Sequence, residues 1–324
     1  MVRRIAQYMA YIPVLILLAL LLLFPEDAAV GARSGLSVCA GVIIPSLFPF
    51  LVASSLFSSM GLHTTLAHIL GPLFQRLSLP PIAAAPLLLG LCGGYPVGAR
   101  AVSELVRSGS LHPKEAERLL PWCNNTGPGF IIGVAGSAVF GSVRIGVLLY
   151  LCHILAAFAL ALLIGRSHAA TQTQPRPVAH PVGPDALPSC ISAAVSAILD
   201  ICGCVVFFSM LTELLRAGGV FSSLSAAISA CTGLEMRWAL SLLSGILELG
   251  CGITSMRGMS PGPQSLALAA FLLGFGGLSV HAQTFSALAD TKIKCARHFA
   301  GRIAHGLLAA ALILLYCFVR PLQI

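Results

Sequence analysis

Two long apolar runs, "YMAYIPVLILLALLLLF" at 8–24 and "RIGVLLYLCHILAAFALALLIG" at 144–165, limit what this chain can fold into. A helix rises 1.5 Å per residue, so about 20 such residues cross the roughly 30 Å hydrocarbon core of a bilayer. Other stretches are as apolar but contain Gly and Pro. With 57% hydrophobic and 9% charged residues, the composition excludes a soluble globular domain. The sequence therefore predicts an all-α, polytopic membrane protein whose first partner is the lipid bilayer.

The net charge of +8 does not indicate nucleic-acid binding, because the basic residues are dispersed between apolar segments. Their pattern is typical of the Lys and Arg residues that orient membrane proteins. The eleven cysteines include no CxxC pair and mostly lie in apolar stretches, where cysteine behaves as a small hydrophobic residue. We therefore expect no nucleic-acid partner, no metal and no cofactor.

The N-terminal segment 1–35 is predicted to be a transmembrane helix. It begins with Arg3 and Arg4, and "PEDAAVGARSG" at 25–35 follows its apolar run. These features are also compatible with a signal peptide that ends near Ala32. The length of the run and the apolar segments that follow favour the membrane helix.

Three blocks of the first half have weak counterparts about 150 residues later, which indicates an internal repeat. The pairs are 39–60 with 189–210, 89–105 with 244–256, and 124–140 with 272–288. A polar, Pro-rich stretch at 166–189 is typical of a loop between two membrane units. The predicted organisation is therefore a helix at 1–35, a first repeat at 36–165, the loop at 166–189 and a second repeat at 190–324.

The positions of the basic residues favour inverted repeats. We assume that the N-terminus is cytoplasmic, that each repeat crosses the membrane three times, and that each contains one hairpin that enters and leaves the membrane on the same side. Four basic residues then fall outside: Arg33, Arg144, Arg237 and Arg320. The larger set falls inside: Arg76, Arg107, Lys114, Arg118, Arg166, Arg176, Lys292, Lys294 and Arg297.

Broken helices are predicted where Gly and Pro interrupt the apolar pattern, as at Gly93, Gly94, Pro96 and Gly98 in "GLCGGYPVGARAVSEL". Irregular backbone at membrane depth is tolerated only where it is buried in protein or lines a wet cavity. Helix N-termini at such breaks suit an anionic group, and matching breaks in two inverted halves indicate a substrate site. The alternative is that the glycines only let helices pack closely.

Polar residues of the first half extend this predicted site. Asn124, Asn125 and Thr126 precede the Gly-Pro-Gly break, where they would bind substrate or, alternatively, cap the helix. Arg100 would cost roughly 2.5 to 3.5 kcal/mol at the centre of an isolated membrane helix. It is therefore expected either beside a cavity, where it could clamp a carboxylate, or at the membrane interface.

In the second half, the candidate substrate-binding residues are Glu248, Thr254, Ser279, His281 and Gln283. A carboxylate at membrane depth usually has a functional role or a partner; alternatively, Glu248 lies at the membrane interface or pairs with Arg257 or Arg302. On a regular helix the alternating residues Ser279, His281 and Gln283 would not share a face, whereas on unwound backbone they could. His281 could then move a proton or contact the solute, or simply pack.

Four stretches carry a resemblance to a known family: "SLFPFLVASSLF", "GGYPVGARAVSELVRSGSLHPKEAERLLPWCNNTGPGFIIGVAG", "GFGGLSVHAQTFSAL" and "RIAHGLL". They resemble the YlbJ family of sporulation integral membrane proteins, within the wider group that has the nucleoside transporter/FeoB GTPase Gate domain. The likeness extends from about residue 37 to 315. It implies that both predicted repeats are Gate-like and that the fold is related to concentrative nucleoside transporters.

The resemblance also implies a role in moving dipicolinate from mother cell toward forespore, in a cell membrane that would be the outer forespore membrane. Dipicolinate is a small planar dianion, which suits Arg100, the amides of Asn124 and Asn125, and two helix N-termini. The second half departs from the family near Gly250 and Cys251, where a more polar residue is expected.

The sequence contains no GxxxxGK[ST] or HExxH pattern, and we expect a transporter and not an enzyme. Its solute is predicted to be a small anion, dipicolinate first, with H⁺ coupling through Glu248 or His281 as a hypothesis. One alternative is a carrier of nucleosides or other metabolites without a sporulation role. Another is a non-transporting membrane scaffold in envelope morphogenesis. A homo-oligomer is left open.

Overall fold

The computed structural model describes residues 2–164 and 186–320, with side chains from residue 11 onward. Every regular element in these ranges is a helix, so the all-α prediction is confirmed. The predicted loop at 166–189 lies outside the described residues as far as residue 185, and Arg166 and Arg176 lie outside them too. The last residues of the predicted loop belong to helix α9.

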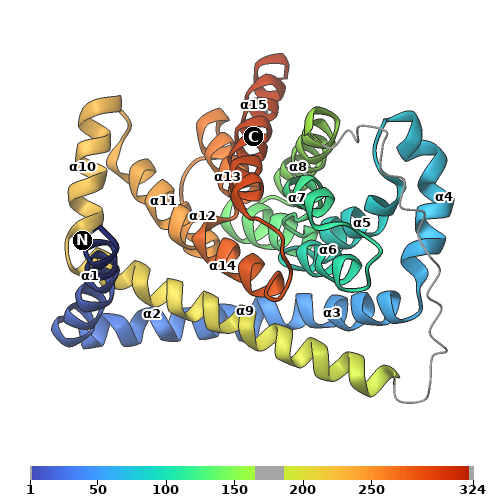
Figure 1. Ribbon diagram of the computed structural model, residues 1–324. Coiled ribbons are helices and arrows are strands. Elements are labelled where there is room, and N and C mark those ends of the chain that lie inside the picture. Colours follow the sequence, from blue (N-terminus) through green and yellow to red (C-terminus); the bar gives the residue numbers. More distant parts are fainter. Residues whose placement is uncertain (1, 165–185, 321–324) are drawn as a thin grey trace.

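The first half follows the N-terminal helix α1 (Val2–Leu23) and consists of two long helical segments around two broken ones (Figure 1). Pro25 starts its first long segment, with Glu26 and Asp27 in the first turn, where their charge complements the helix dipole. In chain order the elements are α2 (Pro25–Val38), the π-helix η1 (Cys39–Ile43), α3 (Ile44–Ser59), α4 (Leu62–Arg76), the 3₁₀ turn η2 (Pro81–Ala83), α5 (Ala84–Gly93), α6 (Val97–Arg107), α7 (Pro113–Cys123), the π-helix η3 (Gly129–Val139) and α8 (Val143–Ile164).

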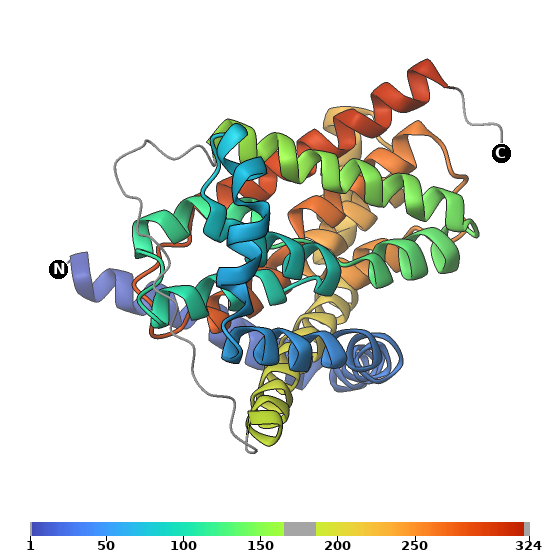
Figure 2. The same ribbon diagram turned by 90° about the vertical axis from the view of Figure 1, so that its right-hand side faces the viewer.

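The second half has the same order of elements: a long helix, a short helix, two broken segments and a long helix. Its elements are α9 (Ala186–Ala217), α10 (Val220–Thr232), α11 (Met236–Leu247), α12 (Leu249–Ser255), α13 (Pro263–Phe275), α14 (Gly277–Ala287) and α15 (Ala296–Val319). In Figure 1 the segment α2–α3 and helix α9 cross below the rest, with α4 and α10 at opposite sides. Helices α8 and α15, which close the two halves, lie side by side (Figure 2).

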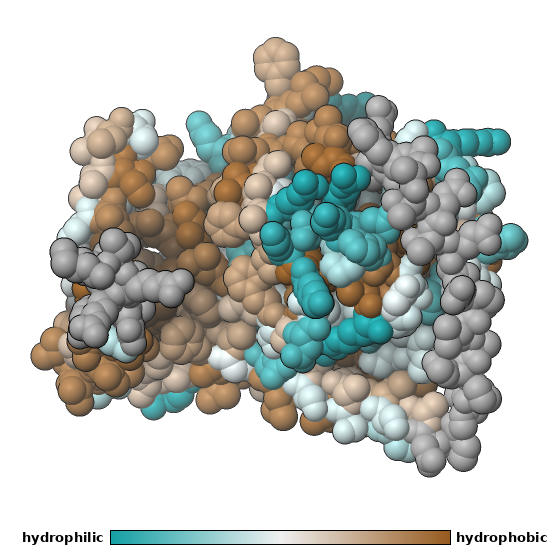
Figure 3. All heavy atoms as spheres, in the orientation of Figure 1, coloured by the Kyte–Doolittle hydropathy of each residue, from teal (hydrophilic) through white to brown (hydrophobic). Residues whose placement is uncertain are grey.

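The described helices make this a multi-pass membrane protein. Large apolar side chains face outward, with Phe318 87% and Leu163 70% exposed, and apolar surface covers much of Figure 3. The bent pair Leu62–Arg76 and Pro81–Gly93 could form one further span. Five helices are long and apolar enough to cross a bilayer: Pro25–Ser59, Val143–Ile164, Ala186–Ala217, Pro263–Ala287 and Ala296–Val319.

The first long span begins at Pro25, so the expected boundary between residues 35 and 36 falls inside a continuous helical segment. The small residues of this stretch have a packing role. A Cβ at Gly31 would lie 2.7 Å from Met210 Cα, and one at Gly35 would lie 2.8 Å from Val206 Cα. Close approach of α2 to α9 therefore accounts for the small residues.

Connectors that correspond in the two halves lie in different places. The region around the α6–α7 connector meets the α14–α15 connector, where Arg107 Nη2 donates to the carbonyl of Ala289 at 2.9 Å. Its counterpart, the α12–α13 connector, contributes Met256 and Met259 to an apolar cluster that includes Phe140 of the η3–α8 turn. Hydrophilic side chains gather in the right centre of Figure 3, over the first of these places. Arg107 and Lys294, two of the basic residues predicted to lie inside, thus lie where the two halves meet.

Candidate functional site

Four breaks interrupt the short helices, and together they form what we call the central junction: residues 94–96, 124–128, 248 and 276. Gly94 and Gly276 have φ of +83° and +90°, a region that other residues rarely adopt. Proline follows closely in the first half, where Pro96 lacks an N–H group to continue a helix. The predicted breaks in both halves are confirmed.

In each half, the two broken segments lie directly against each other at a break. A Cβ at Gly94 would lie 2.8 Å from the Gly127 nitrogen, and one at Gly277 would lie 2.7 Å from the Gly245 carbonyl oxygen. Only residues without side chains allow backbones this close. The glycines at these breaks therefore serve close packing as well as chain reversal.

The two halves are joined at the central junction by hydrogen bonds between broken segments. Thr126 Oγ1 donates to the carbonyl of Leu273 at 2.7 Å. Asn124 Nδ2 donates to Thr284 Oγ1 at 3.0 Å. The breaks thus meet across the halves as well as within them.

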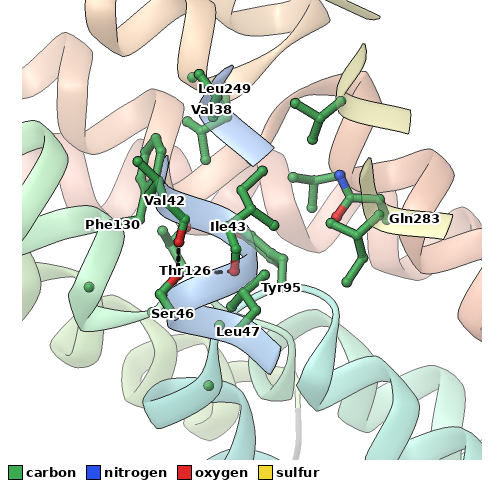
Figure 4. A pocket seen from close by; sticks show the side chains of 18 of the residues that line it. Val38, Val42, Ile43, Ser46, Leu47, Tyr95, Thr126, Phe130, Leu249 and Gln283 are labelled. Carbon is green, nitrogen blue, oxygen red and sulfur yellow. Dashed lines mark hydrogen bonds between the residues drawn. The ribbon is translucent and has the colours of Figure 1, made fainter. Parts of the chain in front are cut away.

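A cavity of about 110 Å³ lies at the central junction, with room for several water molecules. The long segments α2–α3 and α9 form one wall, and broken segments of both halves form the other (Figure 4). It is lined by Val38, Val42, Ile43, Ser46, Leu47, Phe50, Cys92, Gly93, Gly94, Tyr95, Thr126, Gly127, Gly129, Phe130, Ile201, Val205, Glu248, Leu249, Gly250, Val280 and Gln283. We call this space the junction cavity.

Helix N-termini give the junction cavity its polar character. Gly129 begins η3, Leu249 begins α12, and Val280 lies in the first turn of α14. Helix N-termini carry partial positive charge and free N–H groups, so they attract anionic or hydrogen-bond-accepting groups. No basic side chain is among the residues that line the cavity. Both π-helical segments contribute to its lining, and π-helical turns often occur at functional sites.

Glu248 is the only acidic residue among those that line the junction cavity. It is 6% exposed, and its Oε2 accepts a hydrogen bond from the Cys251 N–H at 2.6 Å, which caps α12. Among the described residues, no basic side chain lies within 4.0 Å of its carboxylate. The alternative that Arg257 or Arg302 pairs with Glu248 is therefore wrong.

The amides of the first half hold the breaks in place. Asn124 Oδ1 accepts from the Ala99 N–H at 3.3 Å, so Asn124 caps α6, and Asn125 Nδ2 donates to the carbonyl of Trp122 at 2.8 Å. Both asparagines are fully buried and do not line the junction cavity. Thr126 is the member of this group that lines it.

The segment around His281 is a regular helix, so of the two alternatives the unwound backbone is excluded. Because Gly276 ends α13 with a positive φ, α14 can restart one residue later as a regular helix. Ser279 and Gln283 then share a face and are bonded at 3.3 Å, with Gln283 lining the cavity. The His281 ring lies on another face, with its centroid 4.8 Å from that of Phe299.

Three other predicted site residues lie away from the junction cavity. Arg100 forms an ion pair with Asp200 of α9 at 3.6 Å. Thr254 is exposed and donates to the carbonyl of Gly250 at 2.7 Å. A Cβ at Gly98 would overlap the Cys123 carbonyl, so Gly98 serves helix packing. Of the predicted residues, Gly93, Gly94, Thr126, Glu248 and Gln283 line the cavity.

The sequence interpretation missed Arg302, which was considered only as a partner for Glu248. Arg302 is fully buried in α15 and donates to Tyr95 Oη and to the carbonyl of Gly274. Its signal was a charged residue within an apolar helix, between Gly301 and Gly306. Among the described residues, no group of three or more His, Cys, Asp or Glu could hold a metal ion.

Comparison with known proteins agrees with the motifs. Residues 40–162 match the family model Gate, described as nucleoside recognition. The chain is 27% identical to the sporulation integral membrane protein YlbJ of Bacillus subtilis (strain 168), over 93% of this chain and 80% of that protein. No solved structure matches the chain. The resemblance of this multi-pass membrane protein to the YlbJ family is therefore confirmed, and the first half carries the Gate match.

Proposed function

We propose that this protein carries a small solute across the membrane and that the solute binds in the junction cavity. The observation that carries this proposal is the position of the cavity, where broken helices of both halves meet beside two long helices. Broken helices at corresponding positions in two repeats are the usual substrate site of repeat-built transporters. Polar side chains of the proposed binding site include those of Ser46, Thr126, Glu248 and Gln283.

The arrangement of connectors supports an inverted relation between the halves. The α6–α7 connector lies beside the α14–α15 connector, while its counterpart between α12 and α13 packs near the η3–α8 turn. Corresponding connectors on opposite sides are what inverted repeats require. Movement of one half against the other would then open the junction cavity to each side of the membrane in turn.

The first solute we propose is dipicolinate, transported during endospore formation. Similarity to a sporulation protein supports the biological setting, and helix N-termini facing the cavity support an anion. An ionised Glu248 would repel a dianion, so binding requires this carboxyl group to be protonated. Uptake would therefore be faster at lower pH and coupled to H⁺.

A nucleoside is the second candidate solute. The description of the Gate match is nucleoside recognition, and the cavity combines an apolar lining with uncharged polar groups on Ser46, Thr126 and Gln283. Such a lining suits a neutral planar ring with hydroxyl and amide groups. In this case Glu248 would accept hydrogen bonds from the solute.

The test is uptake of radiolabelled dipicolinate into proteoliposomes, with uridine as competitor. Gly129→Leu places a side chain at the cavity wall and should abolish uptake. Gly133→Leu, in the same π-helix, has no atom within 4 Å of its Cβ position and should behave like the wild type. Transport of uridine alone would favour the nucleoside. No uptake of either solute by folded protein would favour the membrane scaffold.

A further inference from the structure

Arg302 is a fully buried cation without an anionic partner. Its side chain has 0% exposure, and among the described residues no carboxylate lies within 4.0 Å of it. A buried charge is costly unless other groups replace its hydration. The neighbours of Arg302 must therefore supply that stabilisation.

The neighbours that stabilise Arg302 are carbonyl groups at the ends of two half-helices. Nη1 donates to the carbonyl of Pro121 at 3.1 Å, in the last turn of α7. Nη2 donates to the carbonyl of Gly274, in the last turn of α13. Each helix C-terminus carries about half a negative charge on such free carbonyls. The guanidinium thus lies between two negative helix ends, one from each half of the chain.

The remaining contacts of Arg302 are also neutral acceptors. Tyr95 Oη accepts from Nη2, and the Tyr95 ring centroid lies 5.1 Å from the guanidinium carbon. Asn125 Oδ1 lies 3.5 Å from Nη1, and His305 Nδ1 lies 3.1 Å from it. Because a guanidinium only donates, His305 Nδ1 accepts, and the ring proton lies on Nε2. Oxygen predominates in this set of ligands.

Neutral oxygens and helix C-termini are the ligands that bind coupling cations in transporters with broken helices. We propose that Arg302 is a built-in cation that occupies such a place permanently. A tethered charge needs no ion from solution to hold the ends of α7 and α13 together. The central junction would therefore bind no free Na⁺ or K⁺ in the wild-type protein.

Arg302 does not belong to the solute site. It is absent from the residues that line the junction cavity, and Tyr95 lines that cavity while contacting Arg302. Its role is to position the breaks through carbonyl groups. One consequence rests on the proposed function: solute uptake should proceed without a Na⁺ or K⁺ gradient. The binding role itself does not depend on transport.

Thermal unfolding of the purified protein in detergent tests the binding role. Arg302→Ala removes the charge and should lower Tm by about 5–10 °C. Low millimolar guanidinium chloride should restore part of that loss, while urea or choline chloride at the same concentration should not. Arg297→Ala removes an exposed arginine from the same helix and should show neither effect. Equal responses of wild type and Arg302→Ala to every added cation would overturn the proposal.

Two further variants keep the test decisive if Arg302→Ala does not fold. Arg302→Lys retains the charge, so it should fold with a lowered Tm. Arg302→Met retains much of the volume without the charge, so it should be the less stable of the two. Arg302→Met with the Tm of the wild type would overturn the proposal. Because these readouts are unfolding temperatures, they do not depend on whether the protein transports dipicolinate.

The transport consequence is measured separately in proteoliposomes. Replacing internal and external Na⁺ and K⁺ by choline should leave the uptake rate of the wild type unchanged. Uptake that stops in choline would contradict a junction closed to free cations. Failure of all uptake in every buffer would count against the proposed function alone, since the thermal measurements stand without it.

Discussion

The two sides of the central junction differ in what balances the partial charge of the helix ends. On one side α7 and α13 end, and their carbonyls accept hydrogen bonds from Arg302 and Thr126. On the other side η3, α12 and α14 begin around the junction cavity. Among the residues that line the cavity, none is basic and Glu248 is the only acidic one. The negative ends are balanced within the chain. The positive ends face the cavity, and among them α12 is capped by Glu248.

This difference suggests that one side of the junction stabilises the contact between the two halves and the other side binds the solute. Helix ends that are satisfied internally can keep the two halves in register whether or not solute is present. Helix ends around a cavity can also bind water or a solute, although Glu248 already caps α12. Substitutions on the carbonyl side should therefore act mainly on stability, and substitutions around the cavity should act mainly on uptake.

The largest expected effect comes from forcing α6 away from the end of α7, next to the central junction. Gly98→Ala places a Cβ against the carbonyl of Cys123, and backbone cannot move aside as a flexible side chain would. We expect a loss of about 3 kcal/mol in the free energy of unfolding, measured in mixed detergent and denaturant. Gly133→Ala, in open space, is the control. Similar stabilities for the two variants would show that this approach of α6 to Cys123 is not needed.

A smaller loss in the free energy of unfolding is expected from a substitution beside Arg302, on the carbonyl side of the junction. Tyr95→Phe removes the hydroxyl that accepts from Arg302, so a buried guanidinium N–H loses its partner. We expect a cost of about 2 kcal/mol, because hydrogen bonds to charged groups contribute more than neutral ones. Tyr150→Phe removes a hydroxyl that donates to the neutral carbonyl of Leu91 at 3.0 Å and should cost about 1 kcal/mol. Equal costs in thermal unfolding would contradict the special role of Arg302.

Local chemistry explains why the breaks themselves could be predicted. Closely spaced Gly and Pro residues, as at Gly94 and Pro96 and in the Gly-Pro-Gly stretch at 127–129, disfavour a continuous helix on local grounds. The three sequence blocks recur in the same order in the second half, and this likewise predicted that the breaks of the two halves would correspond. These features depend on a few neighbouring residues, which a single sequence contains.

Which side chains meet at the breaks could not be predicted, because helix phase beyond a break depends on tertiary packing. His281 and Gln283 are two residues apart, yet the second lines the junction cavity and the first packs on Phe299. Arg302 was overlooked because its partners are main-chain carbonyls. Every residue has a main-chain carbonyl, so residue identities do not indicate which carbonyl groups will bind a buried arginine.

On the cavity side, Glu248→Gln should change uptake more than stability. Glutamine keeps an oxygen that can accept from the Cys251 N–H, so the free energy of unfolding should change by at most about 1 kcal/mol. The carboxyl group is lost, and dipicolinate uptake should no longer increase as the pH falls. Glu235→Gln, at an exposed position, should retain the pH dependence of the wild type. An unchanged pH profile in Glu248→Gln would remove Glu248 from the coupling.

The smallest effect is expected from Arg100, outside both sides of the central junction. Its side chain is 27% exposed and that of its partner Asp200 is 55% exposed, so the pair should contribute no more than about 1 kcal/mol. Arg100→Ala and Asp200→Ala should therefore destabilise equally, as measured by thermal unfolding, and both should retain dipicolinate uptake. If Arg100 instead clamps the solute carboxylate, Arg100→Ala will lose uptake while Asp200→Ala retains it. That asymmetry would move the solute path from the junction cavity to the contact between α6 and α9, because no residue lining the cavity carries a positive side chain.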